Sequence, residues 1–335
     1  MPSRPAVVLL VCFLLLAGAV VARIQAGGPI EDVPQGAGEG NRGLFKNPIV
    51  EIRAQRAAAG VVVGGALAVA GVMLQCLFRN PLASPDLLGM ASGAGLGVMA
   101  AAYVGFRTTS AVSEVGLGAT GPPALFGALA ALGLTYLFSQ RRGFIDPPSL
   151  LLVGVIVGVM AASLTQFIQY LMPDRGMSAG RWLLGAIGDD ISWRQSAMVG
   201  AVVVAVAIVT GRLGPWMDAA TLGDDEARSV GVRLGWLRSW LFTGSAVLAA
   251  SAVVLAGPIA FVGLICPHLV RLAAGPSHRA LIVGSAMAGG ALVVWADTMV
   301  RTIELPSGRL PISVLTSLIG GPLLIVILRR REPLA

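Results

Sequence analysis

Apolar runs of helix-spanning length recur along the whole chain, separated by short segments rich in Gly, Pro and charge. A helix needs about 20 residues to cross the hydrocarbon core of a bilayer. The pattern lacks the period-two alternation of outer-membrane strands, so helices are favoured. The runs cover residues 5–22, 54–76, 87–106, 122–138, 149–171, 195–211, 237–256, 259–273, 280–300 and 311–328. We therefore predict an all-α membrane protein of about ten transmembrane helices, the eighth of them short.

The sequence shows no separate soluble domain, and we expect residues 1–335 to form a single transmembrane domain. Residues 26–47, rich in Gly, Pro and charge, are predicted to be an external loop. The first apolar run could also belong to a signal peptide, but it exceeds the usual length of about 7 to 15 residues and lacks a good cleavage site. An uncleaved first helix is the better interpretation.

The composition supports a membrane protein: 56% of the 335 residues are hydrophobic and only 12% are charged, with a mean hydropathy of +0.81. The net charge of +7 does not indicate a nucleic-acid partner, because the arginines are spread over loops and helix ends. We interpret them as topology signals and contacts with anionic lipid.

An even number of helices places both termini on one side of the membrane. The run Arg329-Arg330-Arg331 assigns that side to the cytoplasm by the positive-inside rule. Five arginines fall on the outer side against this rule, and we regard them as candidates for external contacts: Arg53, Arg56, Arg175, Arg181 and Arg301.

Glycines recur four residues apart, as in Gly60 and Gly64 or Gly154 and Gly158. In lipid such spacing lets helix backbones approach closely, so packing is the favoured role; a glycine-lined conduit is the alternative.

Several chemistries are excluded or weakly supported. The single lysine, Lys46, follows Phe45, so no phosphate-binding loop of the G-x-x-x-x-G-K-[ST] type exists. The histidines lack ligand partners at helical spacing, and the three cysteines are far apart, so no metal site is predicted. No residue set suits an intramembrane enzyme.

Two sets of charged residues remain near helix ends. Asp297 has Arg301 four residues later, which favours an intramembrane ion pair over a proton relay. Arg53 and Arg56 share one helix face at the outer end of the second run. They could interact with lipid headgroups or dock a partner that bears carboxylates.

The stretch Thr221 to Gly231 is a polar island between two long apolar runs. Asp224 is predicted to cap a short helix there, with Asp225 and Glu226 in its first turn and Gly231 at its end. A solvated loop would also explain the charges. A helical island on the cytoplasmic side suits contact with a soluble partner.

Several motifs, taken in order, resemble the permease subunits of the iron-siderophore, haem and cobalamin ABC importers over nearly the whole chain. They are RAQR at 53–56, GVMLQ at 71–75, FRNPLASPDLLG at 78–89, LGDDEARSVG at 222–231, AGPIAFVGL at 256–264, PHLVR at 267–271, AD at 296–297, LPI at 310–312 and GGP at 320–322.

The resemblance implies a type II ABC importer permease fold: ten helices per subunit, two subunits around a central pathway, and one cytoplasmic ATPase on each. ATP and magnesium would then bind to the ATPase, and this chain would bind no cofactor. The coupling helix that contacts the ATPase would comprise Leu222, Gly223, Asp224, Asp225, Glu226, Ala227, Arg228 and Gly231.

The same resemblance assigns Arg53, Arg56 and Arg301 to docking of an extracytoplasmic substrate-binding protein, although the family commonly has Arg-Leu-Pro-Arg where this chain has RAQR. It places the pathway along residues 149–171 and 311–328, and the inner gate at Pro147, Pro148 and Ser149. We expect a bacterial cell-membrane importer of iron chelates, first of all a ferric siderophore. Haem or cobalamin is the alternative cargo, and an ion-driven secondary transporter is the alternative mechanism.

Overall fold

The computed structural model describes residues 4–25, 47–109, 117–141, 144–172, 184–189, 191–303 and 310–329. The predicted external loop, apart from Asn47, lies outside these residues, as do Arg175 and Arg181.

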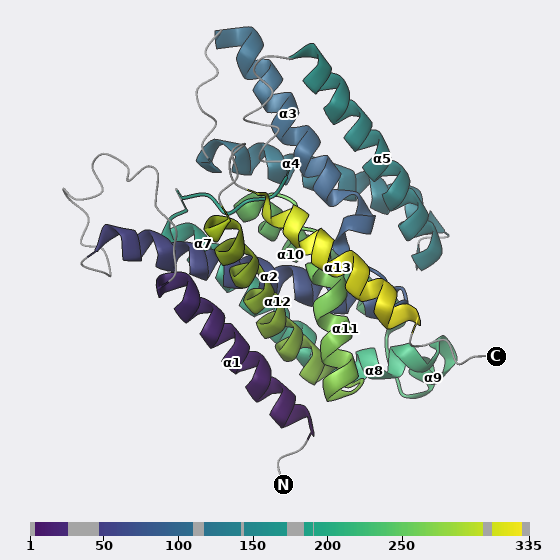
Figure 1. The fold of residues 1–335 in the computed structure, drawn as a ribbon. Coiled ribbons are helices and arrows are strands. Elements are labelled where there is room, and N and C mark those ends of the chain that lie inside the picture. The colour runs from purple at the N-terminus through teal and green to yellow at the C-terminus, as the bar shows by residue number, and fades with distance from the viewer. Residues whose placement is uncertain are drawn as a thin grey trace.

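The described part of the chain is helical except for one two-stranded antiparallel ribbon (Figure 1). The elements are α1 (Arg4–Gln25), α2 (Pro48–Leu77), η1 (Pro85–Leu88), α3 (Met90–Thr109), α4 (Leu117–Ser139), β1 (Gln140–Arg141), β2 (Phe144–Ile145), α5 (Pro147–Leu171), α7 (Trp193–Arg212), α8 (Gly214–Leu222), α9 (Asp224–Ser229), α10 (Leu234–Ala256), α11 (Val262–Ala274), α12 (His278–Thr302) and α13 (Ile312–Arg329).

The prediction of about ten membrane helices is confirmed. Seven described helices are long and apolar enough to cross a bilayer, and shorter apolar helices lie in α3, α11 and α13. Large apolar side chains such as Phe13, Phe126 and Phe167 are exposed on the bundle surface. Since water would disfavour such a surface, it suits contact with lipid or with another membrane subunit.

Helix α2 lies at the centre of the fold and packs against α1, α7, α10, α11 and α12, while α3, α4 and α5 form a neighbouring group (Figure 1). The start of α1 and the end of α13 lie at the same end of the bundle as α8 and α9. We call this end of the bundle the α9 end.

Glycines bring the central backbones together. A Cβ built at Gly64 would lie 2.1 Å from the carbonyl oxygen of Gly289 in α12, and one built at Gly71 would lie 1.8 Å from that of Gly263 in α11. No side chain fits at either contact. The predicted packing role of the glycine spacing is confirmed for Gly64, and Gly154 similarly approaches the carbonyl oxygen of Leu87.

Candidate functional sites at the two ends of the bundle

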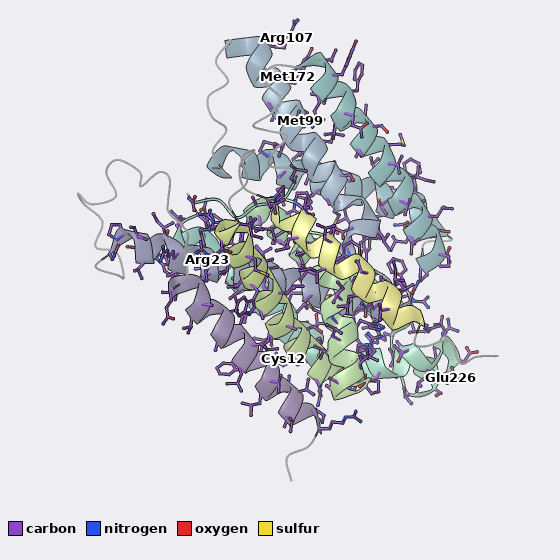
Figure 2. All side chains as sticks on the ribbon, in the orientation of Figure 1. Cys12, Arg23, Met99, Arg107, Met172 and Glu226 are labelled. Carbon is purple, nitrogen blue, oxygen red and sulfur yellow. The ribbon has the colours of Figure 1, made fainter. Side chains whose placement is uncertain are left out.

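One end of the bundle contains a buried group of charges, which we call the ion network: Arg23, Arg56, Asp189, Asp297 and Arg301. Its members come from α1, α2, the segment before α7, and α12. Figure 2 shows Arg23 at this end, far from Glu226 at the α9 end. We call the end that contains Arg23 and the ion network the network end.

Asp297 is the buried centre of the network, with a side chain only 3% exposed. Its Oδ2 accepts a hydrogen bond from Arg23 Nε at 2.8 Å, and its Oδ1 accepts one from Arg56 Nη2 at 2.5 Å. The predicted contact with Arg301 is present but is the longest of the three, at 3.9 Å from Nε to Oδ1. Burial of this carboxylate is compensated by guanidinium groups from three helices.

Asp189 forms the outer part of the network. Its Oδ1 accepts hydrogen bonds from Arg56 Nη1 at 2.7 Å and from Arg301 Nη2 at 2.8 Å. Partial burial alone would raise the pKa of the Asp189 carboxyl, but the two guanidinium groups outweigh it and hold the pKa below its ordinary value. Asp189 is therefore ionised throughout the physiological range.

The structure corrects the expected setting of the two arginines near the start of α2. Arg56 is 3% exposed and paired with Asp189 and Asp297, so its guanidinium does not reach lipid headgroups. Arg53 is partly buried, and its Nη1 donates to the carbonyl oxygen of Ile24 at 3.3 Å. Their spacing of three residues places them on one face of α2, but the carboxylates that pair with Arg56 come from distant parts of the chain.

At the α9 end, the polar island begins differently from the expectation. Leu222 is the last residue of α8, a helix that the sequence did not predict, and Gly223 separates it from α9. Asp224 opens α9 but makes no side-chain cap; its carboxylate instead pairs with Arg79 and Arg238. The helix does end before Gly231, whose φ of +80° suits glycine.

Asp224, Arg79 and Arg238 form a group that we call the Asp224 clamp. Arg238 Nη2 lies 2.8 and 2.7 Å from the two Asp224 oxygens, and Arg79 pairs with Oδ1. Arg79 Nε also donates to the carbonyl oxygen of Ala220 in α8, at 2.7 Å. Burial opposes ionisation of Asp224, yet hydrogen bonds from Arg79 and Arg238 lower its pKa below the ordinary value. The clamp ties the island to the turn after α2 and to α10.

The rest of α9 projects outward. Ala227 is fully buried and fixes the helix against the bundle, whereas Leu222 and Val230 are 77% and 68% exposed. Asp225 is 94% exposed and has Arg228 Nη1 at 3.5 Å. Two large apolar side chains flanked by charges form a surface with the composition of a protein contact.

The predicted gate residues open α5. The Asp146 carboxylate caps this helix by accepting hydrogen bonds from the backbone N–H and the hydroxyl of Ser149. Pro147 and Pro148 occupy the first turn, where the missing N–H groups cost no helix hydrogen bond. Met172, just after α5, lies at the opposite end of the bundle from Glu226 (Figure 2), so the three residues begin α5 at the α9 end.

Sequence reasoning missed Arg23, Asp189, Arg238 and helix α8. Arg23 and Asp297 are 274 residues apart, so no spacing rule relates them. One signal was available: an arginine at the end of an apolar helix needs a buried partner unless it reaches the interface. For α8, the available signal was Pro215, because proline favours the first turn of a helix. It comes shortly after the apolar run that ends at Gly211.

Comparison with known proteins agrees with this architecture. Residues 6–330 match the model of the FecCD transport family. The cobalamin import system permease of Halobacterium salinarum is 36% identical over 281 residues, covering 84% of this chain and 73% of that protein. The hemin transport system permease of Yersinia pestis is 35% identical over 285 residues, covering 84% of each.

A solved structure described as a metal-chelate type ABC transporter in an inward-facing conformation has a TM-score of 0.80 to this chain and 27% sequence identity. It covers 97% of this chain, and 99% of that chain is matched. The shared fold therefore extends over nearly the whole chain. This chain belongs to the FecCD transport family and is a non-catalytic permease subunit of an ABC importer.

Proposed function

We propose that the chain carries a metal chelate across a bacterial cell membrane, with a ferric siderophore as the first candidate cargo. A soluble binding protein delivers the chelate outside, and a cytoplasmic ATPase drives its release inside. Both termini and the α9 end face the cytoplasm in this arrangement, and the network end faces outward. The motor is separate because the chain lacks a phosphate-binding loop.

The exposed surface of α9 is the observation that carries this proposal. A six-residue helix has little stability of its own, yet α9 is held in place by the Asp224 clamp and by buried Ala227. Leu222 and Val230 remain uncovered beside it. Two ion pairs therefore hold α9 in a position that exposes apolar side chains, which suits the binding of another protein. We assign the ATPase to this surface.

The binding protein is assigned to the network end. Three arginines and two aspartates leave the ion network with one excess positive charge, and Arg53 adds another nearby. An acidic surface on the partner complements this charge, and guanidinium groups suit its carboxylates. A second permease subunit, either a copy of this chain or a homologue, completes the pathway lined by α5 and α13.

Haem and cobalamin are the second candidate cargo, because relatives 35% and 36% identical are named as hemin and cobalamin permeases. A growth experiment distinguishes the three candidate cargoes: a ferric siderophore, haem and cobalamin. A deletion strain supplied with one ferric siderophore, hemin or cobalamin as the limiting nutrient should fail on one source only. Normal growth on every source would contradict chelate import.

Reconstitution tests the mechanism. The permease is purified from its source membranes, and the co-purifying ATPase and the binding protein captured on permease nanodiscs are identified by mass spectrometry. We expect chelate uptake into vesicles only with both partners and ATP. Full-rate uptake by the permease alone would overturn the proposal.

A further inference from the structure

Asp189 is the most exposed charged group of the ion network. Its side chain is 34% exposed, compared with 3% for Arg56 and 9% for Arg301. A single oxygen, Oδ1, accepts hydrogen bonds from both arginines. Asp189 therefore lies between these guanidinium groups and the surroundings at the network end.

The two arginines have different relationships with the two aspartates. Asp297 is buried beneath them and is also bonded to Arg23, so its position is determined by three helices. Asp189 lies in the short segment before α7, is bonded to Arg56 and Arg301, and is 34% exposed. If Asp189 moved away, Asp297 would still neutralise part of the charge, and two Nη groups would face outward.

An incoming carboxylate needs these same Nη groups. From this geometry we infer that Asp189 is an internal competitor of the binding protein: it occupies Arg56 and Arg301 in the undocked permease and is displaced by a carboxylate of the partner. The inference rests on the docking role proposed above for these arginines. Docking is then an exchange of one carboxylate for another, which keeps the buried charges compensated at every stage.

Displacement of Asp189 would affect α10 and α13, because the segment that carries Asp189 is hydrogen-bonded to both helices. In the same segment, Ala186 N donates to the carbonyl oxygen of Ala256 at the end of α10, at 2.9 Å. The carbonyl oxygen of Gly185 accepts from Ile312 N at the start of α13, at 3.1 Å. Gly185 has φ of +72°, and a Cβ there would lie 2.2 Å from the carbonyl oxygen of Pro258, so the segment fits tightly.

This connection gives Asp189 a positioning role as well. Residues 184–189 join the docking arginines to the first turn of α13, one of the helices expected to line the pathway. Release of Asp189 by the partner would loosen this segment and with it the start of α13. Docking of the binding protein would thus be sensed at the entrance of the pathway without contact between the partner and α13.

The first test measures docking affinity. Asp189→Asn keeps the shape of the side chain and removes its charge, so Arg56 and Arg301 lose their competitor. We expect the purified binding protein to bind nanodisc-embedded permease at least about fivefold more tightly at physiological salt, mainly through a faster association. Unchanged or weaker binding would overturn the competitor role.

Glu51→Gln is the matched control. Glu51 lies in the first turn of α2 at the same end, and its Oε1 accepts a hydrogen bond from Trp193 Nε1 at 3.3 Å. It removes one negative charge from the same face, so we expect a change below about twofold. Equal effects of the two variants would indicate general electrostatic attraction and refute a specific competitor.

Arg301→Gln separates this inference from the docking proposal. If Arg301 docks the partner, its loss weakens binding, and Asp189→Asn added to it tightens binding less than in the wild type, because only Arg56 is then released. Weakened binding in Arg301→Gln together with no effect of Asp189→Asn would overturn the competitor alone. Full affinity in Arg301→Gln would overturn the docking role itself.

The second test follows the segment directly. Leu184 is 47% exposed, and the cysteines of the chain, Cys12, Cys76 and Cys266, are all buried, so a spin label attached to Leu184→Cys reports on this segment. We expect the label to gain mobility when the binding protein docks, and to be mobile without it in Asp189→Asn. A label that stays immobile in both conditions would refute displacement.

Discussion

Arginine–aspartate pairs stand at both ends of α2, but their settings differ. At the network end, Asp297 and Arg56 are almost fully buried, and five charged side chains from four parts of the chain pair with one another. At the α9 end, Asp224, Arg79 and Arg238 are each about one quarter to two fifths exposed. The 30 residues of α2 give this helix a length of about 45 Å, and it connects the two sites.

This difference in burial indicates that arginine–aspartate pairs have a different role at each end. Buried ion pairs are costly to break, because the remaining partner stays charged without compensation. Partly exposed pairs contribute little to global stability but restrict the position of a short element. We therefore expect the ion network to determine whether the helices stay assembled, and the Asp224 clamp to determine where α9 points.

Asp297→Ala should have the largest effect on stability. It leaves Arg23 and Arg56 buried without their shared carboxylate, which we expect to cost about 3–5 kcal/mol of unfolding free energy. Denaturant unfolding in detergent micelles, followed by circular dichroism, measures this. Asp225→Ala, at an exposed site, is the control and should unfold like the wild type.

Asp224→Ala should have an intermediate effect, about 1 kcal/mol, because its pairs are partly exposed. Transport should fall much more than stability, since α9 loses its attachment to Arg79 and Arg238. Uptake and ATPase rates of the reconstituted complex measure the separation. A variant that transports at the wild-type rate would show that the clamp does not position α9.

Reversal of the exposed charges, Asp225→Lys with Glu226→Lys, should leave the melting temperature unchanged, because neither side chain supports the bundle. It should uncouple ATP hydrolysis from uptake if this surface contacts the ATPase. The measurement is the number of ATP molecules hydrolysed per chelate imported. Wild-type uptake by this variant would remove the coupling role of α9.

The smallest effect is expected from pH. The pKa of Asp224 and that of Asp189 lie below their ordinary value of 3.8, so the charged forms stabilise the folded state at every pH above that value. This contribution is lost only as pH falls below 3.8. The melting-temperature difference between wild type and Asp224→Asn should stay constant from about pH 8 to about pH 5 and shrink below about pH 4. A difference that shrinks near neutral pH would contradict the depressed pKa.

The helices were predictable because each depends on a local pattern. Apolar length and Gly and Pro positions located the seven long and three shorter apolar helices of the described residues, and Gly64 indicated close packing of α2. The short helix α8 was not predicted, because its nine residues are too few to span a membrane and lack the dense charge of the polar island.

The site residues were predictable only as far as their partners were near in sequence. The contact of Asp297 with Arg301 follows from a spacing of four, but its shorter bonds involve Arg23 and Arg56, which lie more than 200 residues away. Asp224 has the residue type and position of a helix cap, yet Arg79 in the turn after α2 and Arg238 in α10 compete for its carboxylate. Tertiary pairing of charges thus overrides local preference at both ends of α2.

The glycine contacts of α2 limit how the molecule can change shape. At Gly64 and Gly71 the backbone of α2 touches those of α12 and α11 with no side chain between them, so sliding or tilting would have to separate main chains already in contact. We therefore expect the three helices to move together as one unit. Deformation during a transport cycle has to occur where side chains mediate the packing, between this unit and the group of α3, α4 and α5, or at α13.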